Sequence, residues 1–110
     1  MKQVIAFIQP FRVEKVVEAL HGVAGLSGAT VTQVRGFGRG RGRHASVEAL
    51  LGTVERARID AMVPDALADE VVGIIRDTAR TGNRGDGKVF VVPLERAVRI
   101  STGEEGEEAV

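Results

Sequence analysis

A nine-residue stretch, TGNRGDGKV at residues 81–89, holds residue types that bind phosphate. Gly82, four further residues and then Gly87 and Lys88 follow the order of a Walker A loop, but Val89 stands where that motif has Ser or Thr. A Walker A loop leads from a strand into a helix, so that phosphate meets the helix N-terminus. Here a helical pattern precedes the stretch and a strand pattern follows it, so the nearby helix end is the negatively polarised one. The order of the elements therefore argues against a P-loop.

Two interpretations of the same stretch remain open. In the first, Gly85, Asp86 and Gly87 turn successive backbone N–H groups toward one anion, as a nest does, and Lys88 adds a cation at the rim. In the second, the glycines only satisfy a turn with positive φ, and Lys88 is a charge on an edge strand. The stretch by itself does not decide between an anion site and a turn.

A second glycine-rich segment, residues 34–58, carries several arginines without a periodic pattern. Connections of about 18 residues are uncommon in compact domains and are usually functional or disordered. The glycines let the backbone approach a ligand, and Arg39, Arg41 and Arg43 offer forked donors for phosphate or carboxylate. The alternatives are a solvated loop or a nucleic-acid segment, but only Phe37 is available to stack on bases. We therefore expect no nucleic-acid partner.

The composition excludes several other kinds of site. The 110 residues include no cysteine, so disulfides, thiolate metal sites and cysteine nucleophiles are excluded. No paired carboxylates or Ser-His-Asp set is visible, and we expect neither an enzyme nor a metal site. Lys plus Arg and Asp plus Glu number 15 each, so there is no net field to attract nucleic acid. The apolar run at residues 4–8 is too short to span a membrane, and we expect a soluble cytoplasmic protein without membrane insertion.

Strand and helix patterns alternate in the first half of the chain. Residues 2–9 are apolar at nearly every position and end at Pro10, which predicts a strand. Apolar residues then recur at helical spacing and predict a helix that ends at Gly22 and Gly25. The residues of this apolar stripe are Val13, Val16, Val17 and Leu20. Residues 29–34 are rich in β-branched side chains and predict a second strand.

The same order of elements returns in the second half. Residues 56–63 alternate as a strand that ends at Pro64, and Asp65 is predicted to be the N-cap of the next helix. The predicted buried stripe of this helix consists of Leu67, Val71, Ile74, Ile75 and Thr78. Gly82 fits the C′ position after the helix, and residues 88–92 read as the last full strand.

A β-α-β unit used twice predicts an α+β fold, the ferredoxin-like sandwich. We expect an antiparallel four-stranded sheet with both helices on one face. The strands read apolar on both sides, so the uncovered face is expected to pack on copies of the chain in closed cyclic symmetry. The fold also brings the two glycine-rich segments to one edge, where they would share an anion.

One domain is expected at residues 1–102, with a flexible loop at residues 39–54. The remaining residues, 103–110, carry four Glu and no basic side chain. This composition predicts a mobile acidic tail beyond the domain.

Three stretches resemble one known family in the same order across nearly the whole chain. They are VIAFIQPFRVEKVVEAL at residues 4–20, TVTQVRGFGRGRG at residues 30–42 and RTGNRGDGKVFVVPLERAVRISTGEEGE at residues 80–107, and they resemble the PII signal-transduction family. The resemblance implies the doubled β-α-β sandwich in a homotrimer, with ATP or ADP bound in three clefts between subunits. It also implies that the glycines of residues 81–89 form a nest.

The resemblance implies roles for individual residues. Residues 85–88 would be the family's B-loop around the phosphates, and residues 36–39 would be the base of its T-loop against the nucleotide. Thr30 and the backbone near Met62 would lie close to the adenine, and Arg99 would contact a phosphate across the subunit boundary. The implied nucleotide-binding residues are Thr30, Gly36, Phe37, Gly38, Arg39, Met62, Gly85, Asp86, Gly87, Lys88 and Arg99.

The chain departs from the family pattern at several positions. Gly40 replaces a glutamine that helps to hold magnesium and 2-oxoglutarate, and Arg56 replaces a lysine that clasps the same ligand. A glycine offers no side-chain carbonyl to a metal, which argues against magnesium. Ser101 replaces a second arginine, and one cation fewer should favour ADP or AMP over ATP. The loop is also a few residues short and contains no tyrosine for modification.

A short-loop branch of the family, associated with carboxysomes and bicarbonate uptake, is similar in these departures. The resemblance to it implies a site for a small anion such as bicarbonate, because arginine can pair both oxygens of the anion in a fork. The residues of this expected site are Arg39, Gly40, Arg41 and Arg56.

The expected function is a non-catalytic sensor. Nucleotide and bicarbonate are expected to order the 39–54 loop, which then regulates an unknown target protein or transporter in carbon metabolism. The alternative is a nitrogen-regulatory protein that senses 2-oxoglutarate with ATP or ADP and acts on nitrogen enzymes or an ammonium transporter. Slow ATP hydrolysis is the enzymatic alternative, which release of phosphate would distinguish.

Overall fold

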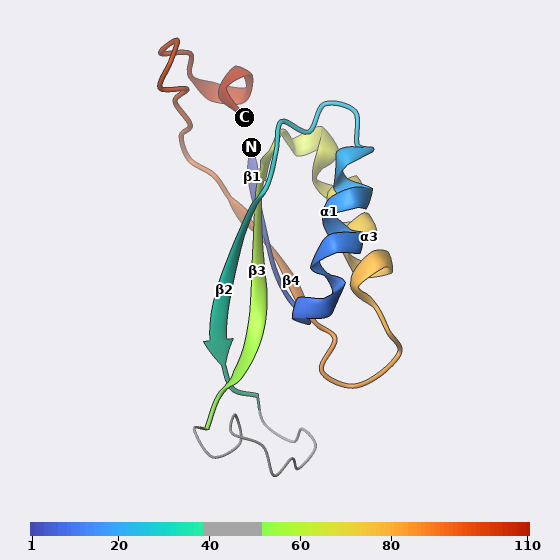
Figure 1. Cartoon of the computed structure of the whole chain (residues 1–110). Coiled ribbons are helices and arrows are strands. Elements are labelled where there is room, and N and C mark those ends of the chain that lie inside the picture. The colour runs from blue at the N-terminus through green and yellow to red at the C-terminus, as the bar shows by residue number, and fades with distance from the viewer. Residues whose placement is uncertain (39–51) are drawn as a thin grey trace.

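The computed structural model describes residues 1–38 and 52–110 (Figure 1). These residues include one four-stranded sheet in the order β2-β3-β1-β4, in which every neighbouring pair is antiparallel. The strands are β1 (Lys2–Ile8), β2 (Thr30–Gly36), β3 (Val54–Val63) and β4 (Gly87–Pro93). The interior strands are therefore β3 and β1, and β1 has β3 and β4 on its two sides.

Two helices lie on one face of the sheet, α1 (Val13–His21) and α3 (Asp65–Ala79) (Figure 1). A 3-10 turn, η1 (Pro10–Arg12), leads into α1, and a second, η2 (Gly106–Ala109), lies near the C-terminus. The strands β1 and β2 both run antiparallel to β3, so they are parallel to each other with α1 between them in the chain. The strands β3 and β4 flank α3 in the same way. The predicted ferredoxin-like sandwich is confirmed.

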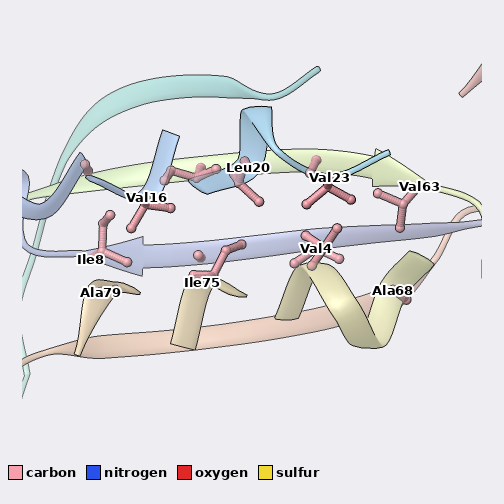
Figure 2. Packing of buried hydrophobic residues seen from close by; sticks show 14 residues of the cluster. Val4, Ile8, Val16, Leu20, Val23, Val63, Ala68, Ile75 and Ala79 are labelled. Carbon is pink, nitrogen blue, oxygen red and sulfur yellow. The ribbon is translucent and has the colours of Figure 1, made fainter. Parts of the chain in front are cut away.

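Alternate residues of the strands fill the core between sheet and helices (Figure 2). A period of two puts every second side chain of β1 and β3 on the helix face. The buried strand residues are Val4, Ala6, Ile8, Ala57, Ile59, Ala61 and Val63. The helices and the turn after α1 add Val16, Leu20, Val23, Ala68, Val71, Ile75 and Ala79. The core is entirely aliphatic, as a chain poor in aromatic residues requires.

The buried stripe of α3 is rotated from the predicted one. Ala68 and Ala79 are buried, whereas Leu67 and Ile74 are only partly buried against the core. Thr78 is half-buried and lies outside the core cluster, and its hydroxyl donates a hydrogen bond to the Ile74 carbonyl at 2.6 Å. The alanines explain the rotation, because small side chains let the helix backbone approach the sheet closely.

The start of α3 also differs from the prediction. The helix begins at Asp65, and Pro64 occupies the N-cap position without a side-chain hydrogen bond. The carboxylate of Asp65 instead accepts a hydrogen bond from the N-terminal ammonium of Met1, with a distance of 2.8 Å between N and Oδ1. This contact lowers the pKa of Asp65. The carboxylate still lies at the positive end of the helix, where the macrodipole favours it.

Element ends differ from the sequence pattern by one or two residues. β2 continues to Gly36 and β3 starts at Val54, because these two residues pair with each other although neither extends an apolar pattern. The last strand spans Gly87–Pro93 rather than residues 88–92. Helix α3 ends at Ala79 with Arg80 as its C-cap. Gly82, with a φ of +90°, therefore lies one residue past the C′ position that it was predicted to occupy. Ladder hydrogen bonds, rather than side-chain pattern, set these ends.

The last residues fold back on the chain instead of extending as a separate tail. Val98 and Glu105 form an antiparallel bridge, and the N–H of Gly106 donates a hydrogen bond to the Ala97 carbonyl at 3.1 Å. Arg96 pairs with Glu105 at 3.0 Å. Two of the acidic residues after 103, Glu104 and Glu105, therefore have basic partners within the C-terminal hairpin, residues 96–106.

The face of the sheet opposite the helices carries both apolar and charged side chains. The rings of Phe7 and Phe90 meet edge to face with centroids 6.3 Å apart. Arg58 lies 5.7 Å over the Phe7 ring and pairs with Asp60 at 2.8 Å. The hydrogen bond from Arg58 lowers the pKa of Asp60, whose carboxylate also accepts a bond from Gln3 at 3.1 Å. This open face is therefore more polar than the predicted two-sided apolar sheet.

The start of β4 requires glycine. A Cβ on Gly87 would lie 1.8 Å from the Phe7 carbonyl oxygen, and its φ of +110° is unfavourable for other residues. We expect Gly87→Ala to lower the free energy of unfolding by about 3 kcal/mol or more. In contrast, Gly73→Ala should raise it by about 0.5–1 kcal/mol, because this helical position has space for a methyl group. Urea unfolding at one protein concentration compares the two, and equal stability of both variants would contradict the assignment.

Candidate functional site

The 81–88 loop, residues 81–88, joins α3 to β4 and is held together by one carboxylate. Asp86 accepts hydrogen bonds from the backbone N–H groups of Thr81 at 2.8 Å and Gly82 at 3.0 Å, and a third from the Thr81 hydroxyl. The Thr81 hydroxyl, followed by the backbone N–H groups, lowers the pKa of Asp86 by stabilising its charged form. The resemblance places Asp86 beside a ligand, whereas its side chain here closes the loop on itself.

The 81–88 loop lies against the ends of β1 and β3. Gln9 Nε2, directly after β1, donates a hydrogen bond to the Gly85 carbonyl at 2.8 Å. Arg56 Nη2 lies 3.7 Å from the position that a Cβ on Gly85 would occupy. Gly85 has a φ of +87°, in the left-handed region that backbone nests use. The predicted meeting of the two glycine-rich segments at one edge is thus present in the fold.

Two cations lie on the open face of the sheet at this end, Lys88 within the 81–88 loop and Arg56 on β3. Lys88 pairs with Phe7 in the register, so its side chain shares the face of the Phe7 ring and is exposed. Arg56 is half-buried on β3, and its Nη1 donates to the Glu55 carbonyl at 2.8 Å. The carboxylate of Asp86 is already bonded inside the loop, so Lys88 and Arg56 give this end of the sheet a basic character.

The described part of the T-loop base lies at the same end. Gly36 closes β2 opposite Val54, and Phe37 and Gly38 follow it as exposed residues. Arg35, one of the clustered arginines but not a predicted site residue, donates to the Thr53 hydroxyl at 3.0 Å and to its carbonyl at 3.2 Å. These bonds fix the two strands where they leave the sheet. The predicted anion-binding residues Arg39, Gly40 and Arg41 lie outside the described residues.

A pocket of about 540 Å³ lies at the opposite end of the sheet and contains both predicted adenine residues, Thr30 and Met62. Thr30 begins β2, and Met62 is next to the last residue of β3. The lining residues that the sequence patterns did not identify include Asp60, Arg96, Ala109 and Val110. In the sequence, two arginines at 96 and 99 precede two glutamates at 104 and 105. This charge pattern is the signal that could have predicted contacts among the C-terminal residues.

Arg99, the predicted phosphate contact, is engaged within its own chain. Its Nη2 donates a hydrogen bond to the Glu108 carbonyl at 3.0 Å, and its Nε lies 3.5 Å from the Glu104 carboxylate. Both charged side chains are almost half exposed, so solvent weakens this pair. Arg99 therefore belongs to the C-terminal hairpin, at the same end as the Thr30 pocket.

The predicted site residues thus form two groups at opposite ends of the sheet. Gly36 and the 81–88 loop lie at one end, and Thr30, Met62 and the C-terminal hairpin lie at the other (Figure 1). β2 connects the two ends, and seven residues at about 3.3 Å each place Thr30 and Gly36 roughly 20 Å apart. The 81–88 loop and the predicted adenine residues Thr30 and Met62 therefore do not meet within one chain.

No helix among the described residues is long and apolar enough to cross a membrane. No cluster of three or more His, Asp or Glu side chains suited to a metal ion occurs in the same part of the chain.

Comparison with known proteins gives matches over nearly the whole length. The family profile described as Nitrogen regulatory protein P-II matches residues 1–104. The chain is 43% identical over 113 residues to the Nitrogen regulatory protein P-II of Haemophilus influenzae, and 41% identical over 113 residues to that of Azospirillum brasilense. It is 42% identical over 113 residues to the Nitrogen regulatory protein P-II 1 of Escherichia coli K12. Each of these three matches covers 100% of both chains.

The role of Asp86 predicts a pH dependence. Its folded-state pKa is lowered, so its contribution to stability is complete above the ordinary Asp pKa of 3.8 and is lost as the pH falls through the lowered value. We expect Asp86→Asn to flatten the loss of stability with acid below pH 3.8 relative to the wild type. Urea unfolding at a series of pH values measures this.

The matched control for Asp86→Asn is Asp69→Asn, on the exposed side of α3. Asp69 takes part in no ion pair within the described residues. The Asp69→Asn variant should show the same change of unfolding free energy with pH as the wild type. An Asp86→Asn profile that also matches the wild type would show that the loop bonds add no stability.

Proposed function

The chain belongs to the nitrogen regulatory protein P-II family, and on this premise we propose that it is a signalling protein that binds adenine nucleotides between the subunits of a homotrimer. The observation that carries the proposal is the separation of the two residue groups by roughly 20 Å of sheet. A nucleotide is shorter than that sheet, so it cannot contact both groups of one chain. A binding site that uses both groups must therefore be completed by a second chain. The phosphate end of one subunit would therefore face the adenine end of its neighbour.

The open face of the sheet supports the trimer. A monomer rarely leaves large apolar side chains exposed side by side, and Phe90 beside Phe7 is 46% exposed in the single chain. The Arg58–Asp60 pair on the same face is satisfied within the chain, so it can be buried without leaving an unpaired charge. Closed packing of three copies would cover this face.

The phosphates are assigned to the 81–88 loop. Lys88 and Arg56 supply positive charge there, and the left-handed glycines allow backbone N–H groups to face the anion. Adenine is assigned to the pocket of Thr30 and Met62 in the neighbouring subunit, and Arg99 would reach the outer phosphates from there. We propose ADP, AMP or ATP as the ligand.

Regulation of nitrogen metabolism is the better-supported biological role. The inorganic-carbon role expected from the arginine-rich loop is not supported, because the similar proteins are named for nitrogen regulation. Matches over the full length of both chains do not support membership of a short-loop branch either. We therefore propose 2-oxoglutarate as the second ligand, since Arg56 offers a forked donor for a carboxylate beside Gly85.

The output would be contact with a target protein. The family acts by regulation, so we propose that ligands change the 39–54 loop and thereby its binding of a nitrogen enzyme or a transporter. No catalytic step is part of this proposal. Hydrolysis of ATP, measured as released phosphate, at a rate as fast as the regulation of the target would contradict it.

Calorimetry of the trimer with ADP and ATP tests the nucleotide site. Lys88→Ala removes one charge-assisted hydrogen bond and should weaken binding roughly 10- to 150-fold. Lys15→Ala, an exposed lysine on α1, is the matched control and should bind as the wild type does. Equal affinity of the Lys88 variant would mean that the phosphates lie elsewhere.

The second ligand is tested by repeating the ATP titration with magnesium and 2-oxoglutarate, and the ADP titration with bicarbonate. We expect 2-oxoglutarate to tighten ATP and bicarbonate to leave ADP unchanged. Tighter ADP binding in bicarbonate, with no effect of 2-oxoglutarate, would favour the inorganic-carbon role over the nitrogen role.

The trimer is tested by placing a charge on the open face. Phe90→Glu should convert the trimer to monomers, because a buried unpaired carboxylate is costly. Phe11→Glu, a 69% exposed position outside the sheet, is the matched control and should stay trimeric. Light scattering after size exclusion gives the masses, and an intact Phe90→Glu trimer would show that another surface mediates assembly.

A further inference from the structure

Gln9 connects the central strand to the 81–88 loop. It follows the last residue of β1 and precedes Pro10, and its backbone carbonyl accepts a hydrogen bond from the Arg12 N–H at 3.0 Å. With its backbone fixed at φ −66° and ψ 136°, its half-buried side chain reaches across to donate to the Gly85 carbonyl at 2.8 Å. No residue type or spacing in the sequence singled out this contact.

The contact fixes the direction of one peptide group. A trans peptide is planar, and its C=O and the following N–H point in opposite directions. Because the Gly85 carbonyl points to Gln9 at the end of β1, the N–H of Asp86 must point away from β1. The orientation of this peptide is set by ψ of Gly85, which has no Cβ to limit it, and by φ of Asp86, which is negative.

The direction of this peptide matters for an anion. With the N–H of Asp86 outward, the loop presents a positive dipole end, which is what a nest requires. If the peptide flipped, the Gly85 carbonyl oxygen would point outward and repel a phosphate. A flip needs a rotation of ψ at Gly85, which has no Cβ to restrict it, and of φ at Asp86, whose negative value already favours the observed orientation. The bond from Gln9 adds to this preference from outside the loop.

We infer that Gln9 is a positioning residue of the phosphate end: its bond to Gly85 holds the 85–86 peptide so that the Asp86 N–H faces the bound phosphate. This rests on the proposed function, since it assumes that the 81–88 loop holds the phosphates. The division of roles is then clear. Asp86 closes the loop through its carboxylate, and Gln9 orients the backbone N–H of Asp86. Lys88 and Arg56 supply the positive charge.

The test is Gln9→Met, which keeps the length of the side chain and removes its donor. The variant should weaken ADP binding roughly 2- to 12-fold, the usual range for one neutral hydrogen bond. Adenosine, which lacks phosphate, should bind the variant and the wild type equally. Gln33→Met, at an exposed position of β2, is the matched control and should change neither affinity.

A second readout follows the amide itself. In ¹⁵N-labelled wild-type trimer, ADP should shift the Asp86 amide resonance, and Gln9→Met should reduce that shift at saturating ADP. Unchanged ADP affinity in an intact Gln9→Met trimer would overturn the inference, as would equal weakening of ADP and adenosine. If the wild type itself binds no ADP, the proposed function fails and the inference with it, whereas failure of the Gln9 variant alone leaves the proposed function standing.

Discussion

The close approach of β4 to the end of β1 is the constraint on which the rest of the structure depends. The backbone of Gly87 lies so near the Phe7 carbonyl that any Cβ would overlap it. Only with glycine at this position does β4 pair with β1 along its whole length, from Pro93 to Gly87. That pairing carries the 81–88 loop to Gln9 and brings it beside Arg56. A single backbone contact in the sheet therefore places the groups that can receive an anion.

The length of the sheet has an equally direct consequence for function. Antiparallel strands of seven to ten residues separate the 81–88 loop from the Thr30 pocket, and a folded chain cannot shorten them. A ligand that needs both ends must lie between chains. Binding and assembly are then coupled, because each ligand would contact residues of two subunits. A regulatory protein gains from this coupling, since one ligand can bias the arrangement of the whole assembly.

Local charge pairing explains how a chain without net charge keeps a basic end. Asp86 directs its carboxylate into its own loop, Asp60 is bonded to Arg58, and Asp65 is bonded to the N-terminal ammonium. Arg96 and Arg99 are paired with glutamates of the C-terminal hairpin. Lys88 and Arg56 take part in no ion pair within the described residues, and both lie at the end of the sheet that carries the 81–88 loop. The position of these two cations follows from the register of β3 and β4 against β1 rather than from the composition.

The sequence by itself determined the doubled β-α-β order, because the periods of two and of 3.6 residues, with Pro10 and Pro64 as stops, depend only on local backbone geometry. The family motifs identified the glycines and lysine of the 81–88 loop. Only the tertiary structure decided which groups meet across the chain. The partner of Asp65 is 64 residues away, and that of Gly85 is 76 residues away, so no local pattern predicts either contact. The separation of the two site groups likewise depends on the sheet, whose register fixes distances that a linear pattern does not contain.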